Sequence, residues 1–167
     1  MKKVIALILA IIILISLVAC GSTGDKPKPI ENEKQQNQEQ NVEKVQNDNS
    51  IEIAAEAIKM ILDKNMGGSG IDYSLAYEGS ALAISVKADG IAEEVSKAIA
   101  LGYDDTYEPW VTMRESMVSL CSSIYDALGS FGVEDGSVVV SIMNDANMDN
   151  ILLSIFNGVV VYDAMAK

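Results

Sequence analysis

The feature that most limits the fold of this 167-residue chain is a polar segment, residues 21–50, that cannot contribute to a hydrophobic core. It is rich in Gln, Asn, Glu and Lys, and its branched apolar residues are Ile30, Val42 and Val45. Such low hydrophobicity is typical of a disordered tether. A coiled coil is not expected here, because no apolar heptad is sustained. The fold is therefore confined to residues 51–167, a length typical of one domain.

Residues 1–20 differ sharply from this segment, because Lys2 and Lys3 precede an apolar run that ends in Leu17-Val18-Ala19-Cys20. A charged start, an apolar stretch and small residues are the anatomy of a secretory signal. The ending resembles the lipobox of bacterial lipoproteins. That resemblance implies removal of residues 1–19 and lipidation of Cys20, which would hold the mature chain on the extracytoplasmic face of a cell membrane. A spanning helix is disfavoured because the apolar run from Val4 to Ala19 is shorter than the roughly 20 residues required.

The expected organisation is thus a cleaved signal peptide (1–19), a lipidated cysteine with a polar tether (20–50) and one extracytoplasmic domain (51–167). Thirty flexible residues have an end-to-end distance of about 30 Å. The domain contains 6 basic and 18 acidic side chains, a formal charge of −12. This charge disfavours nucleic-acid binding, which depends on neutralising phosphates. It is compatible with a cationic partner, and it equally favours solubility and spacing from an anionic envelope.

The periodicity of apolar residues predicts the elements of the domain. Helical spacing is expected over 51–66, 91–101 and 109–129, with Pro109 in the first turn of the last helix. Alternation predicts strands over 71–78 and 82–86, paired as a hairpin. Three further strands are expected over 137–143, 151–156 and 159–162, and Asn157-Gly158 joins the last two as a strong hairpin signal.

This order, αββααβββ, predicts an α+β domain. We expect an antiparallel sheet of about five strands with about three helices packed on one face. The terminal strand from Val159 to Tyr162 is a candidate edge for strand addition.

The best candidate for ligand recognition is the segment before the long helix, where three aromatic residues and three carboxylates lie within eight residues. Its predicted ligand-binding residues are Tyr103, Asp104, Asp105, Tyr107 and Glu108. Aromatic rings beside acids can stack on sugars or hold a cation. Helix capping explains much of the same pattern, because negative charges belong at a helix N-terminus.

A second candidate site consists of Asp145, Asn147 and Asp149, whose alternating oxygens resemble the start of a calcium loop. The pattern then fails, because the sixth position is Asn150 and the twelfth is Phe156. A polar turn is therefore favoured and no metal is assigned. Cys121 lies on the apolar side of the predicted helix and is interpreted as a buried structural thiol.

Enzymatic chemistry has little support in the sequence. The chain has no histidine, which removes the commonest general base, and it has neither Ser-x-x-Lys nor Gly-x-Ser-x-Gly. The favoured hypothesis is a non-enzymatic, cofactor-free binding module for an envelope protein, peptide or small ligand. The alternative is a small hydrolase of envelope glycans that uses paired carboxylates, either Asp104 with Asp105 or Asp145 with Asp149.

Overall fold

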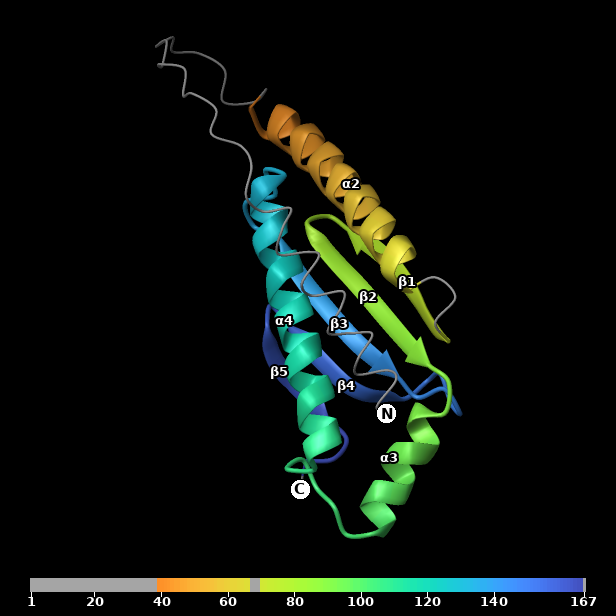
Figure 1. Cartoon of the computed structure of the whole chain (residues 1–167). Helices are drawn as coiled ribbons and strands as arrows, with labels where there is room; N and C mark the ends of the chain where they lie inside the picture. Colours follow the sequence, from red (N-terminus) through yellow and green to blue (C-terminus); the bar gives the residue numbers. More distant parts are fainter. Residues whose placement is uncertain (1–38, 67–69, 167) are drawn as a thin grey trace.

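The computed structural model describes residues 39–66 and 70–166, and Figure 1 shows their arrangement. The predicted signal peptide, Cys20, the first part of the tether and the glycines of the turn at 67–69 lie outside the described residues. The described elements follow the predicted order: α2 (Glu39–Met66), β1 (Ile71–Glu78), β2 (Ala81–Ala88), α3 (Ile91–Ala100), α4 (Glu108–Ser130), β3 (Ser137–Met143), β4 (Ile151–Phe156) and β5 (Val159–Asp163). The predicted α+β class is confirmed.

The five strands form one sheet in the order β1-β2-β3-β4-β5. Three of the four pairings are antiparallel, but β2 and β3 run parallel. The prediction of an antiparallel sheet was therefore wrong at its centre. The reason is the long connection from Ala88 to Ser137, which contains both α3 and α4. This helical crossover brings the chain back to the end of the sheet at which β2 begins. Strand β3 therefore runs in the same direction as β2.

Two helices, α2 and α4, cover one face of the sheet, with α2 over β1 and β2 and α4 over β3 and β4. Helix α3 does not join this layer as predicted, and Figure 1 shows it beyond the end of β2. Its buried side chains, Ile91, Ala92, Val95 and Ala98, lie on one stripe that closes the end of the core. The opposite face of the sheet carries no helix among the described elements.

The alternation seen in the sequence sets which side chains form the core. Leu82, Ile84 and Val86 of β2 are buried beneath the helices, as are Val138 and Val140 of β3. Burying a large aliphatic side chain contributes about 1.5–3 kcal/mol, so this apolar layer is the main stabilising element of the fold.

Helix α2 begins at Glu39, twelve residues before its predicted start, so part of the predicted tether is helical. The polar residues of this extension include Glu, Gln and Lys, which have good intrinsic helix propensity. Its buried face develops later, at Ile51, Ala54, Ala55, Ile58 and Leu62. The sequence pattern located this apolar stripe and did not detect the polar turns that precede it.

Candidate functional site

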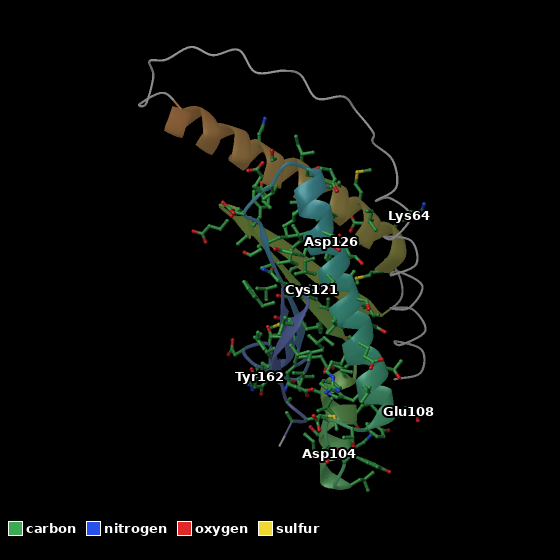
Figure 2. All side chains as sticks on the ribbon, turned by 90° about the vertical axis from the view of Figure 1, so that its left-hand side faces the viewer. Lys64, Asp104, Glu108, Cys121, Asp126 and Tyr162 are labelled. Carbon is green, nitrogen blue, oxygen red and sulfur yellow. The ribbon has the colours of Figure 1, made fainter. Side chains whose placement is uncertain are left out.

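The predicted recognition segment forms the link between α3 and α4, at one end of the molecule, where Figure 2 labels Asp104 and Glu108. The rings of Tyr103 and Tyr107 stack on each other with centroids 4.6 Å apart and an interplanar angle of 26°. Trp110 is fully buried and belongs to the core. The structure therefore brings two of the predicted aromatic residues together.

The three acidic residues of this segment differ in their contacts. Asp104 Oδ1 accepts hydrogen bonds from the Thr106 backbone N–H at 3.0 Å and from its hydroxyl at 2.6 Å, which builds a tight turn. Asp105 lies 3.9 Å from Arg114 Nη1, while Glu108 is exposed in the first turn of α4. Recognition by the five predicted residues stays a prediction.

The predicted cation loop connects β3 to β4, and its oxygens face backbone N–H groups. Asp145 Oδ2 accepts a hydrogen bond from Gly90 N at 2.6 Å, and Oδ1 accepts one from Ala92 N at 2.8 Å. Asn147 Oδ1 accepts from Asp149 N at 3.2 Å. Asp145 thus caps α3 from a distant loop. Burial alone would raise the pKa of its carboxyl, but the two backbone hydrogen bonds outweigh burial and the pKa is lowered.

Cys121 is fully buried, as expected for a structural thiol. Burial raises the pKa of its thiol, despite the hydrogen bond that its Sγ accepts from Gly158 N at 3.3 Å. A buried neutral thiol is a poor nucleophile.

A shallow pocket of about 220 Å³ lies at the C-terminal end of α4. Its lining consists of Tyr125, Asp126, Leu128, Gly129, Val133, Glu134 and Gly136. Neither of the carboxylate pairs considered for hydrolysis lines this pocket. Within residues 39–66 and 70–166, no group of three His, Cys, Asp or Glu side chains is placed to hold a metal ion.

The most distinctive surface of the described domain is the strand β5 together with the end of β4. We call Phe156, Val159, Val160, Val161 and Tyr162 the β5 edge surface. The side chains of Val159, Val161 and Tyr162 are 65%, 61% and 50% exposed. Strand β5 pairs with β4 on one side, and no described strand pairs with its other side. The predicted edge position of 159–162 is therefore confirmed.

The two edges of the sheet differ in chemistry. Edge strand β1 carries the exposed charges Asp72 and Glu78, which discourage pairing with another chain. In β5 no charge precedes Asp163, and that carboxylate points inward to Trp110 and Arg114. The feature of the β5 edge that opposes pairing with another chain is a register shift opposite Ser154 and Ile155. An exposed apolar edge of this kind is a surface on which another polypeptide can bind.

The sequence did contain a signal for this surface. The segment from Val159 to Tyr162 is apolar at successive positions, without the alternation of a strand that has one solvent face. In the described sheet this strand pairs with β4 alone, so its other side is uncovered there.

Comparison of the chain with protein-family models, with curated proteins and with solved structures gave no match. Among the helices that the structure describes, none is both long and apolar enough to cross a membrane.

Proposed function

We propose that this chain is a lipid-anchored extracytoplasmic binding module that recognises a polypeptide partner by strand addition at the β5 edge surface. The lipobox resemblance supports the anchor, with Cys20 as the lipidated residue. A diacylglyceryl group supplies two acyl chains, which together give stable attachment to a bilayer. The anchor therefore leaves the domain free to use its own surfaces for recognition.

The observation that carries the proposal is the exposed part of β5 from Val159 to Tyr162, which has no charged residue and lies at an open sheet edge. In strand addition, the main chain of the partner supplies hydrogen bonds to the edge, and its alternate side chains contact the two sides of the sheet. Phe156 and Val159 are opposite each other in the β4–β5 register and offer such a contact on the face without helices. Strand β5 carries no charge before Asp163, whereas β1 carries the exposed charges Asp72 and Glu78.

The test is selection of binding peptides from a random 12-residue phage-display library on the full chain held in detergent micelles. Selected peptides should slow amide hydrogen exchange in residues 159–163 and leave β1 unaffected. A Val161→Lys variant should lose their binding, because lysine at an edge opposes strand pairing. The matched control is Ala76→Lys, which places the same charge at an exposed position of the other edge strand.

Peptides that bind both variants equally would contradict the proposal. Protection confined to residues 99–107 would also contradict it and would assign recognition to the segment around Tyr103 and Tyr107.

A further inference from the structure

The pocket at the C-terminal end of α4, which we call the α4 pocket, shares no residue with the β5 edge surface. Figure 2 labels one of its lining residues, Asp126, near this end of the helix. The volume of about 220 Å³ is below the roughly 300–1,000 Å³ of pockets that hold drug-sized ligands. The α4 pocket therefore has room for a small molecule or for a single side chain.

The lining of the α4 pocket combines apolar, aromatic and acidic side chains. Leu128 and Val133 belong to the buried core and supply apolar contact. Tyr125 is 41% exposed, and the carboxylates of Asp126 and Glu134 are exposed as well. No basic residue is among the lining residues. A ligand for this pocket should therefore have an apolar part and a positive charge.

The negative charge at the α4 pocket is not neutralised by the described part of the chain. Within residues 39–66 and 70–166, no ion pair reaches Asp126 or Glu134. The last turn of α4 contains no basic residue. The C-terminal end of a helix carries a partial negative charge that favours cations. Two carboxylates and the helix end thus act in the same direction on a ligand in the pocket.

Gly129 gives independent evidence that this space is kept open. It lies within α4, where glycine is less stable than alanine, and its φ is not positive. A Cβ built on Gly129 would meet no heavy atom within 4 Å. Neither the backbone conformation nor the packing of the helix therefore requires glycine at this position. Because Gly129 lines the α4 pocket, its missing side chain leaves room there for a ligand.

We infer that the α4 pocket binds an organic ammonium ion with a short aliphatic chain, an inference that goes beyond the proposed function. The ammonium group would contact the carboxylates of Asp126 and Glu134, and the ring of Tyr125 can attract the same cation. The aliphatic chain would lie against Leu128 and Val133, which removes apolar surface from water.

A metal ion fits the α4 pocket less well than an organic cation. Hard cations need six or more oxygen ligands, and the walls at Leu128 and Val133 supply none from their side chains. In the described ranges, no group of three His, Cys, Asp or Glu side chains is placed to hold a metal. The ammonium group has two sources, a free aliphatic amine and a lysine side chain of a protein, and the experiment below separates them.

Three probes of equal chain length test the inference by ¹H–¹⁵N NMR titration of the full chain in nonionic detergent micelles. They are n-butylammonium, 1-butanol and butyrate, which differ in charge and share the aliphatic chain. Butylammonium should shift the amide signals of Tyr125, Gly129 and Val133 and should bind at least tenfold more tightly than butanol. Butyrate should not saturate these signals, because two carboxylates repel it.

Neutralising the two carboxylates tests the charge of the α4 pocket. Asp126→Asn with Glu134→Gln should weaken butylammonium binding about fivefold, the combined effect expected of two exposed ion pairs. The matched control is Glu52→Gln with Glu56→Gln, which removes two exposed carboxylates of α2 and should change binding less than twofold. Both double variants have the same net charge, so their difference reports the pocket alone.

Filling the α4 pocket tests its position. Gly129→Leu should weaken butylammonium binding at least tenfold, because the new side chain occupies the space of the ligand. Gly129→Ala adds one methyl group and should change binding less than threefold. Alanine and leucine favour a helix more than glycine does, so neither variant should lower the urea midpoint of unfolding.

A blocked lysine, Nα-acetyl-lysine N-methylamide, distinguishes the two sources of the ammonium group. Binding as tight as that of butylammonium would support the inference with a lysine side chain of a protein as the ligand. Binding more than tenfold weaker would support it with a free amine as the ligand, because the pocket then excludes the main chain beside the side chain.

Four results would overturn the inference. Equal binding of butanol and butylammonium would show that charge is not recognised. Equal weakening by the two double variants would show general attraction to an acidic protein. Unchanged binding to Gly129→Leu would place the ammonium ion elsewhere, and displacement by calcium chloride beyond that by sodium chloride of equal ionic strength would assign the carboxylates to a metal ion. None of these results bears on the β5 edge surface, so strand addition succeeds or fails separately.

Discussion

The indole Nε1 of Trp110 donates a hydrogen bond to Asp163 Oδ1 at 2.9 Å and so joins the buried start of α4 to the end of the edge strand β5. The same carboxylate accepts from Arg114 Nη1 at 2.7 Å and from the Met165 backbone N–H at 2.9 Å. Its side chain is 6% exposed. One acid therefore fixes the end of β5 against the helix and holds the edge surface in place.

Replacing Asp163 with Ala should destabilise the domain by about 2–4 kcal/mol, because it leaves a guanidinium and an indole N–H without their acceptor in a largely buried place. Urea unfolding measures this change. Trp110→Phe, which removes the N–H and keeps most of the apolar contact, should cost less. A loss below about 0.5 kcal/mol for Asp163→Ala would show that the cluster contributes little to stability.

The cap that Asp145 provides to α3 should make stability depend on pH. Its pKa is lowered in the folded chain, so its contribution is complete above the unfolded value near 3.9 and is lost as pH falls through the lower folded value. Asp145→Asn should cost about 1–3 kcal/mol at pH 6, because the amide has one acceptor oxygen for the two backbone N–H groups of Gly90 and Ala92. The difference in free energy of unfolding between the wild-type chain and Asp145→Asn should become smaller below about pH 4, as measured by urea unfolding at a series of pH values. Asp149→Asn, in the same loop, is the control and should change the free energy of unfolding by less than about 0.5 kcal/mol at pH 6.

The comparison of sequence and structure shows which contacts a local pattern can predict. Alternation located β1 and β2, β-branched and apolar residues located β3, and Asn157-Gly158 located the β4–β5 hairpin, because these signals arise within a few residues. The partners of Asp145 are 53 and 55 residues away, so nothing in its neighbourhood indicated a helix cap. The parallel pairing of β2 with β3 likewise depends on the whole crossover between them.

The candidate surfaces also combine features that the sequence predicts with contacts that only the fold creates. Sequence composition identified the aromatic and acidic residues at 103–108 but could not show that Asp104 is engaged by Thr106. It identified 159–162 as an edge candidate.

The turn residue Gly158 should not tolerate alanine, for two separable reasons. Its φ of +82° lies in the left-handed region, where a non-glycine residue costs about 1–2 kcal/mol. A Cβ there would also overlap the Ser122 hydroxyl. Gly158→Ala should therefore lower the free energy of unfolding by more than Gly79→Ala, which has a φ of +57° but open space around its Cβ. Adding Ser122→Ala should recover the excess. Equal losses for the two glycines would mean that the turn moves away from α4.

The buried thiol of Cys121 should be protected from alkylation in the folded chain. With Cys20→Ser as background, Cys121 is the remaining cysteine of the sequence. Because burial raises the pKa of its thiol and blocks access, iodoacetamide at pH 8 should label it slowly, and urea should accelerate labelling sharply. Mass spectrometry measures the labelled fraction. Rapid labelling without urea would indicate that β4, β5 and α4 separate readily.

Lipidation of Cys20 predicts where the chain is found in cells. Produced in a bacterium supplied with labelled palmitate, the wild-type chain should carry the label and sediment with the membrane fraction. Cys20→Ser should lose the label, because the thiol is the acceptor that the lipobox resemblance implies. The matched control is Cys121→Ser, which removes the other thiol and should keep both the label and the membrane location. Palmitate on the Cys20→Ser chain would contradict the assignment. Membrane attachment without label would instead point to the apolar segment from Val4 to Ala19 as an uncleaved anchor.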